Sequence, residues 1–213
     1  MSIICPSVTP TTTSVDEYRQ MLEKVTAFAP RVQIDLMDGE FASPQTISVT
    51  DIWWPESVSA DIHLMYEHPV DFMESILSLR PNLVIIHAEA EGELEQCMQH
   101  LRSNGIKTGV ALLQETSVAS VAELLKLADH ALIFSGTLGS YGGTADLALL
   151  SKVEEIRALH PDIEIGWDGG ANMETVETFA RGGVDVINVG GAIQRATNPQ
   201  DVFESLNRLV HTA

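Results

Sequence analysis

Several features of other protein classes are scarce in this chain. It has two cysteines in 213 residues, Cys5 and Cys97, and neither lies in a CxxC pattern. We therefore expect neither a disulfide framework nor a structural zinc site, and the expected location is the reducing cytoplasm. No apolar run approaches the roughly 20 residues of a membrane-spanning helix, and no basic residues precede the short apolar run at the N-terminus. Neither export nor a membrane partner is expected.

Basic residues are also few. The chain has 12 Lys and Arg residues against 30 Asp and Glu residues, which gives a formal net charge of -18. This charge repels the nucleic acid backbone and anionic membrane surfaces, so no nucleic acid partner is expected. A small anionic substrate remains compatible with it, because backbone N–H groups can bind a phosphate locally.

The chain does contain a repeated alternation of short Val- and Ile-rich runs with helical patterns. Strands are predicted at residues 3–7, 31–38, 59–66, 83–90, 107–114, 130–136, 164–170 and 185–192. Helical spacing of apolar residues occurs at residues 15–28, 69–80, 93–105, 118–129, 147–161, 173–183 and 199–211. The remaining crossover, residues 41–58, is predicted to hold only a short helix.

Eight strands that alternate with helices predict parallel pairing and a closed barrel. We therefore expect an α/β protein with a (β/α)8 TIM barrel that fills residues 1–213 as a single domain. An open, doubly wound sheet is the alternative. It lacks support, because no GxGxxG motif follows the first strand.

Polar residues cluster where the predicted strands end. They are Ser7, Gln33, Asp35, Asp38, His63, His87, Glu89 and Asp168. The active sites of such barrels lie at this end of the strands. For any one residue alone, a satisfied internal hydrogen-bond network is the alternative interpretation, because a buried charge needs a partner. Several strand ends with such residues together favour a site.

The placement of lysine limits the chemistry of that site. Three of the four lysines, Lys24, Lys126 and Lys152, lie in predicted helices, and Lys107 opens its strand at the opposite end of the barrel. No lysine is therefore expected to form a Schiff base or transfer a proton there. Acid–base work is left to carboxylates or histidine.

Glycine-rich segments follow the last three predicted strands. They span residues 139–144, 168–172 and 189–193, and Arg195 is the basic residue nearby. Glycines of this kind also serve plain turns. Three such segments at one end of one barrel instead favour a phosphate site built from backbone N–H groups.

At this point the sequence resembles a known family over nearly its whole length: the ribulose-phosphate 3-epimerases. The resemblance depends on the motifs "CPS", "IDLMDGEF", "DIHLMYEHP", "IIHAEA", "GVALLQETSV" and "WDGGAN". It implies a (β/α)8 barrel that inverts C3 of D-ribulose 5-phosphate to give D-xylulose 5-phosphate, as in pentose phosphate metabolism.

The resemblance also implies roles for individual residues. Asp35 and Asp168 would act as acid and base, and with His63 they would bind a divalent metal such as Zn, Mn, Fe, Co or Mg. The substrate, a small phosphorylated sugar, would contact Ser7, His63, Met37, Met65, Gly142, Gly143, Gly169, Gly170, Gly190 and Gly191.

Gln33 departs from the family pattern, which has a histidine there as the fourth metal ligand. An amide oxygen is a poorer ligand than imidazole for zinc, iron or cobalt, but it is acceptable to manganese or magnesium. Phe134 and Gly191 also replace a methionine and a serine that are usual in the family. Three interpretations remain: a metal-dependent epimerase, a metal-independent sugar-phosphate isomerase or epimerase in which the Gln33 amide donates to the enediolate, and a non-catalytic sugar-phosphate-binding relative.

Trp53 and Trp54 are adjacent in the crossover at residues 41–58. They could cover the side of the barrel locally, or they could form a contact between subunits. We expect the chain to form a homo-oligomer.

Overall fold

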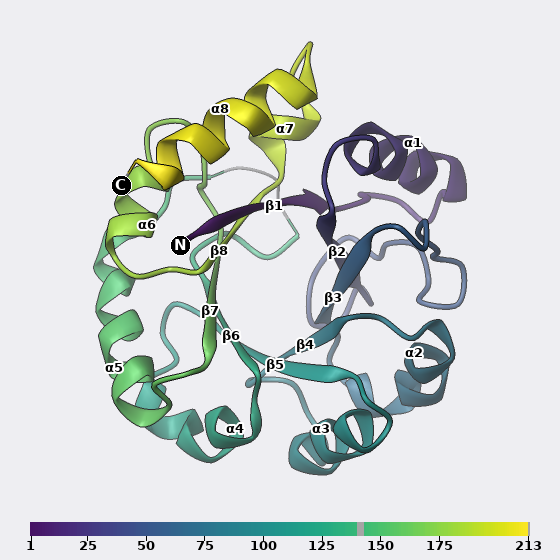
Figure 1. Ribbon diagram of the computed structural model, residues 1–213. Coiled ribbons are helices and arrows are strands. Elements are labelled where there is room, and N and C mark those ends of the chain that lie inside the picture. Colours follow the sequence, from purple (N-terminus) through teal and green to yellow (C-terminus); the bar gives the residue numbers. More distant parts are fainter. Residues whose placement is uncertain (140–142, 213) are drawn as a thin grey trace.

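Eight parallel strands close into a barrel in the order of the sequence, in a computed structural model that describes residues 1–139 and 143–212 (Figure 1). The strands are β1 (Ile3–Val8), β2 (Arg31–Met37), β3 (Ser59–Met65), β4 (Leu83–His87), β5 (Lys107–Leu112), β6 (His130–Phe134), β7 (Glu164–Asp168) and β8 (Val186–Val189). Because β1 pairs with both β2 and β8, the sheet is closed. The predicted TIM barrel is confirmed, and the open-sheet alternative is excluded.

Helices surround the barrel and cover its outer face (Figure 1). They are α1 (Val15–Thr26), α2 (Met73–Leu79), α3 (Leu94–Ser103), α4 (Ala122–Leu127), α5 (Ser151–Leu159), α6 (Val176–Arg181), α7 (Gly191–Gln194) and α8 (Pro199–His211), with 3-10 turns η1 (Pro69–Phe72), η2 (Val118–Val121) and η3 (Leu147–Leu150). None of the helices in the described ranges is long and apolar enough to cross a membrane.

Helix α1 shows how the local sequence forms these elements. The Ser14 side chain accepts a hydrogen bond from the Glu17 backbone N–H and so caps the first turn. Tyr18, Leu22 and Val25 recur at helical spacing and are buried. The helix therefore presents one apolar face to the barrel.

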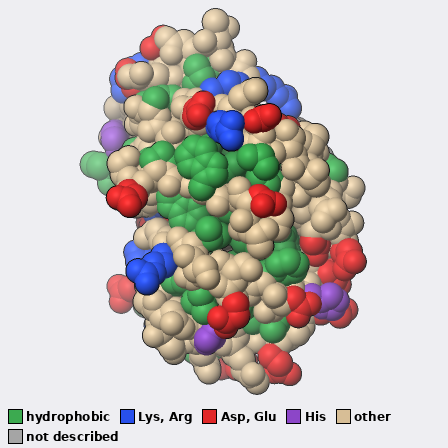
Figure 2. Space-filling model, turned by 90° about the vertical axis from the view of Figure 1, so that its right-hand side faces the viewer, with side chains coloured by type: hydrophobic (Ala, Val, Ile, Leu, Met, Phe, Trp, Pro, Cys, Tyr) green, Lys and Arg blue, Asp and Glu red, His purple; other side chains and the backbone are tan. Residues whose placement is uncertain are grey.

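The crossover between β2 and β3 contains no helix in its residues 41–58, all of which are described, so the prediction of a short helix there was wrong. Pro44 and Pro55 fall within this segment, and proline cannot donate a helical hydrogen bond. The segment instead covers the barrel with buried side chains such as Val49. Figure 2 shows hydrophobic side chains gathered on this face, where Trp53 and Trp54 line a hollow of about 590 Å³.

Strand β8 ends earlier than its apolar run suggests. It was predicted to reach residue 192, but it stops at Val189, because Gly190 has φ -90° and ψ -85°, outside the strand region. Helix α7 begins at the next residue, Gly191. The chain therefore turns into a helix at the mouth of the barrel.

Charged side chains fill the N-terminal end of the barrel interior. The Arg31 guanidinium donates to Asp61 (2.6 Å) and to both carboxylate oxygens of Glu164 (2.8 and 2.7 Å). His130 Nδ1 lies 2.8 Å from Glu164 Oε2, and Asn82 donates to Asp61 at 2.7 Å. Both acids at this end thus bind one cation that the fold itself supplies.

Candidate active site

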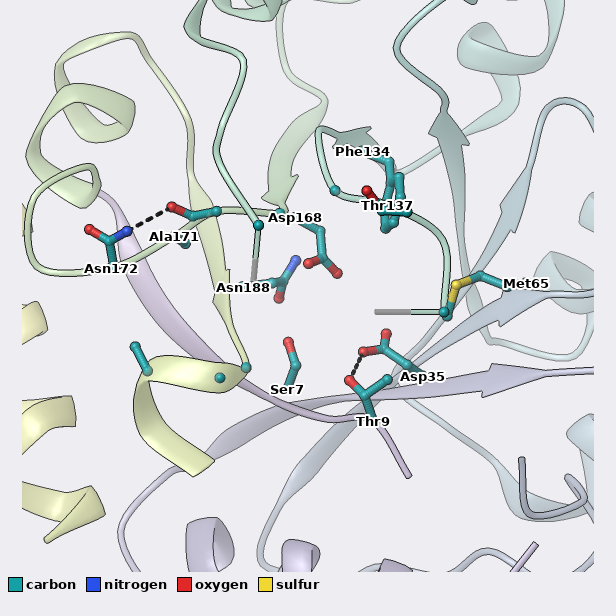
Figure 3. A pocket seen from close by; sticks show the side chains of 18 of the residues that line it. Ser7, Thr9, Asp35, Met65, Phe134, Thr137, Asp168, Ala171, Asn172 and Asn188 are labelled. Carbon is teal, nitrogen blue, oxygen red and sulfur yellow. Dashed lines mark hydrogen bonds between the residues drawn. The ribbon is translucent and has the colours of Figure 1, made fainter. Parts of the chain in front are cut away.

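A cavity of about 240 Å³ opens at the C-terminal end of the barrel (Figure 3). The predicted site residues that line it are Ser7, Asp35, Met65, Gly143, Asp168, Gly169, Gly170, Gly190 and Gly191. These come from β1, β2, β3 and β7 and from the segments that follow β6, β7 and β8. Residues predicted from widely separated motifs therefore meet in one place.

The other predicted residues lie outside the described lining or cannot be placed. His63 and Met37 are buried, and Met37 packs with Met65 and Ala42. Gly142 lies outside the described residues. Asp38, one residue out of phase, accepts backbone hydrogen bonds from the loops after β2 and β3 and so shapes their ends.

Asp35 and Asp168 approach each other across the barrel through Gln33. The Gln33 Nε2 donates to Asp35 Oδ1 (2.9 Å) and to Asp168 Oδ2 (2.5 Å). The Thr9 hydroxyl donates to the other oxygen of Asp35, a contact visible in Figure 3. The two carboxylates are therefore held by neutral donors rather than by a cationic side chain among these contacts.

The electrostatics of Asp168 follow from this placement. Burial raises the pKa of Asp168 to about 7, and the nearby charge of Asp35 adds to the rise. His63, the Gln33 amide and the Gly169 backbone oppose it. Proton uptake by Asp168 thus relieves the repulsion between the two carboxylates close to neutral pH.

A row of polar side chains determines the tautomer of His63. His63 Nε2 lies 2.9 Å from His87 Nε2, and His87 Nδ1 lies 3.4 Å from Glu89 Oε2. Burial lowers the pKa of His87 to about 4, so this ring is neutral at pH 7. Its one N–H points to the Glu89 carboxylate, so its Nε2 accepts from His63 Nε2–H.

In the neutral His63 ring, this tautomer has its lone pair on Nδ1. The atom lies 3.0 Å from Asp35 Oδ1 and 4.0 Å from Asp168 Oδ2. The ligand atoms of the three residues all lie within 4.8 Å of one another. Three acceptors that face one another need a proton or a cation between them, and one imidazole with two carboxylates suits a divalent metal with open positions. The donor set therefore fits a metal.

The glycine loops depend on close backbone approach. Gly169 has φ +111°, and a Cβ there would lie 2.1 Å from the Gly136 backbone nitrogen. Gly170 has φ +70°, and its Cβ would lie 2.3 Å from the Ala145 nitrogen. Only glycine fits both positions, so the loops after β6 and β7 pack directly against each other at the rim of the cavity.

Lysine is absent from the described lining of the cavity, as its placement in the sequence predicts. The Lys152 Nζ, on α5, donates to the carbonyls of Leu113, Gln114 and Thr116 at 2.8–2.9 Å. That amine holds the loop after β5 in place. Arg195 is the basic residue among the described lining residues.

Sequence reasoning missed Thr9 and Asn188. Thr9 lies just beyond β1 and has the same parity as Ser7, so side-chain alternation was a usable signal for it. Asn188 lies within the apolar run of β8, directly beside Asp168 in the register of β7 and β8. A lone amide in such a run was the available signal.

Known proteins of one family resemble this chain over most of its length. Residues 3–194 match the model of the family described as "Ribulose-phosphate 3 epimerase family". A protein named ribulose-phosphate 3-epimerase from Schizosaccharomyces pombe is 27% identical over 188 residues, which cover 85% of this chain and 82% of that one. A protein of the same name from Mycobacterium leprae is 29% identical over 212 residues, 95% and 94% of the two chains.

Solved structures show the same fold at lower identity. The structure of KGPDC from Streptococcus mutans in complex with a phosphorylated sugar has a TM-score of 0.73 and 11% identity, and the match covers 99% of this chain and 98% of that one. At this identity the likeness concerns the fold alone.

Proposed function

This chain belongs to the ribulose-phosphate 3-epimerase family, and we propose that it epimerises C3 of a ketose phosphate, either D-ribulose 5-phosphate to D-xylulose 5-phosphate or a close analogue. The observation that carries this proposal is the pair Asp35 and Asp168, which face one cavity from β2 and β7 and are joined by one amide. The named relatives support it, and so does the fold shared with a protein solved in complex with a phosphorylated sugar.

The chemistry explains the need for two carboxylates. Inversion of C3 removes the proton from one face of the carbon, passes through an enediolate and returns a proton to the other face. One aspartate acts as the base and the other as the acid, and their roles exchange in the reverse direction. The Thr9 hydroxyl and the Gln33 amide hold Asp35 in position for this transfer.

The charge that develops on the enediolate oxygens also needs a positive partner. Asp35, His63 and Asp168 would hold a divalent metal, which when bound supplies Lewis-acid stabilisation of that charge. His87 and Glu89 orient the His63 ring so that its Nδ1 lone pair faces the site.

The phosphate group would bind at the glycine-rich rim. Gly143, Gly169, Gly170, Gly190 and Gly191 line the cavity together with Arg195. Backbone N–H groups that face a cavity bind a phosphate even when the protein as a whole carries a negative charge. This rim lies on the β6, β7 and β8 side of the opening, away from β3.

The Gln33 contacts favour a second candidate, an epimerase or isomerase that needs no metal. In this version one of the two Nε2–H groups that donate to the aspartates turns to the enediolate oxygen and donates to it instead. Because Gln33 lies at the centre of the carboxylate pair, its amide can take part of the role that the metal has in the first version.

Chelation and isotope exchange separate these candidates. In the metal-dependent version, EDTA abolishes turnover of D-ribulose 5-phosphate, and Mn²⁺ restores it. In the metal-free version, exchange of the C3 proton with D2O survives EDTA. Asp35→Asn stops the exchange in both versions, whereas Asp162→Asn, an exposed change between α5 and β7, leaves it intact.

A third outcome would refute both enzyme candidates. If no pentulose or hexulose phosphate is turned over or exchanged, while phosphate esters still raise the melting temperature, the chain is a sugar-phosphate-binding relative without catalysis.

We further propose that the enzyme is a cytoplasmic homo-oligomer. Trp53 is 40% exposed and directly precedes Trp54 in the crossover whose residues 41–58 form no helix. Tyr18 donates a hydrogen bond to the Trp53 carbonyl and contacts its ring edge-on, so the aromatic surface is held by α1. Exposed aromatic side chains on a rigid support suit a contact between subunits.

A further inference from the structure

Asn188 carries a buried donor that the fold leaves unused. Its side chain lines the cavity, the residue is 3% exposed, and its Nδ2 has no hydrogen-bond partner among the described residues. A buried N–H without a partner destabilises a fold, and most such groups in native proteins are satisfied. A strand position that keeps this donor is therefore well suited to a ligand that supplies the acceptor.

Ser7 provides a second unused group in the same place. Its Oγ is buried, it lines the cavity, and it too has no partner among the described residues. Ser7 belongs to β1, which pairs with β8 through Cys5 and Asn188. Figure 3 shows the Asn188 side chain between those of Asp168 and Ser7.

The position of Asn188 along the cavity indicates which part of a substrate it meets. In the strand register it lies beside Asp168, one of the two proposed catalytic carboxylates. Two residues further on, Gly190 belongs to the proposed phosphate rim. Asn188 therefore lies between the group that acts on C3 and the backbone that would hold the phosphate.

In a ketopentose 5-phosphate, C4 and its hydroxyl separate C3 from the carbon that bears the phosphate. We propose that Asn188 determines substrate specificity: its Nδ2–H donates to the C4 hydroxyl oxygen, and that hydroxyl donates to Ser7 Oγ. This inference rests on the proposed function and deepens it, because it names the substrate atom that the site reads. The chain then selects ketose phosphates with a hydroxyl next to the reacting centre on the phosphate side.

The test compares two substrates, D-ribulose 5-phosphate and its 4-deoxy analogue, which keeps the C3 hydrogen, the ketone and the phosphate. With the wild-type protein, we expect kcat/KM to be lower for the analogue by about tenfold to hundredfold, because bound analogue leaves the Asn188 donor unpaired. Asn188→Val should lower kcat/KM for D-ribulose 5-phosphate by a similar factor. It should also reduce the difference between the two substrates to the part that the Ser7 contact contributes, about threefold to tenfold, since neither substrate then leaves the Asn188 donor unpaired.

Two controls separate specificity from a structural effect. Asn104→Val makes the same change at an exposed position at the C-terminal end of α3 and should keep the wild-type discrimination. The melting temperature of Asn188→Val should equal or exceed that of the wild type, because the substitution removes a buried donor without a partner. A structural role would lower it and would leave the discrimination in place.

The outcomes are decisive in either direction. Wild-type turnover without discrimination against the 4-deoxy analogue overturns this inference and leaves the proposed function standing. Discrimination that Asn188→Val leaves undiminished does the same. If Asn188→Val does not fold, two other measurements decide whether Asn188 reads the C4 hydroxyl. One is the ratio of kcat/KM for the two substrates in the wild type, and the other is the same ratio in the isosteric Asn188→Asp, which replaces the donor by an acceptor. Wild-type protein that shows neither turnover nor C3 exchange overturns the proposed function, and this inference with it.

Discussion

Replacing Gln33 by histidine tests the metal site most directly. The wild-type amide donates to Asp35 and to Asp168, both of which are candidate metal ligands. For its oxygen to ligate a metal, the amide must turn over and give up both hydrogen bonds. Gln33→His offers an imidazole nitrogen in the same place without that cost.

The magnitude follows from those two contacts. A hydrogen bond to a charged group contributes about 1.5–3 kcal/mol, so the amide gives up roughly 3 kcal/mol or more when it turns. Since 1.4 kcal/mol corresponds to a factor of ten in binding, Gln33→His should lower the Zn²⁺ dissociation constant about a hundredfold. The gain for Mg²⁺ should be smaller, because magnesium prefers oxygen ligands.

Isothermal titration with Zn²⁺, Mn²⁺ and Mg²⁺ measures these constants on the metal-stripped protein, and elemental analysis gives the metal content as purified. Gln20→His, on the exposed face of α1, controls for an added surface imidazole. If Gln33→His neither binds Zn²⁺ more tightly than this control nor retains more metal, the reasoning about the lost ligand is wrong.

Three further predictions concern the rest of the chain. His87→Leu leaves His63 Nε2–H without an acceptor and should weaken Mn²⁺ binding by about 10- to 100-fold in titration. His87→Gln can accept that hydrogen bond and should keep most of the Mn²⁺ affinity. Equal losses of affinity in the two variants would refute the tautomer argument. Arg31→Met leaves Glu164 and its neighbours without a cation and should lower the free energy of unfolding at pH 7 by about 3 kcal/mol in urea titrations, and an unchanged value would contradict this. Burial favours a raised pKa for Glu164, but the Arg31 and His130 contacts outweigh burial and hold that pKa well below its usual value. The free energy of unfolding of the wild type should therefore fall as the pH drops below about 4.5. Glu164→Gln should make this fall with pH less steep. Trp53→Ser should reduce the mass measured by sedimentation velocity, and an unchanged mass would exclude this face as the subunit contact.

The barrel was predictable because its determinants are local. Each strand is a short apolar run of β-branched residues, and each helix repeats its apolar residues at helical spacing, so the order of elements can be read along the chain. Alternation along β2 then places Gln33 and Asp35 on one face, and the structure joins them by a hydrogen bond. Alternation along β7 places Trp167 outside the barrel, where it stacks on Phe179.

What could not be predicted depends on distant parts of the chain. Asn188 lies beside Asp168 because of the register in which β7 pairs with β8. The pattern of apolar residues within either strand does not predict that register. The early end of β8 depends on the backbone angles of Gly190, which glycine leaves open. The contact between Thr9 and Asp35 likewise requires β1 and β2 to be paired.

The two ends of the barrel interior solve the same electrostatic problem differently. At the N-terminal end, the carboxylates of Asp61 and Glu164 are both bound by Arg31, so the fold itself supplies a cation there. At the C-terminal end, the side-chain partners of Asp35 and Asp168 among the described contacts are a hydroxyl, an amide and an imidazole. A buried acid pair without a cationic partner is costly, and the other end of the same barrel shows that an arginine can provide one. The proposed acid–base chemistry at C3 needs a positive partner for this acid pair, and a proton or a divalent metal can supply it.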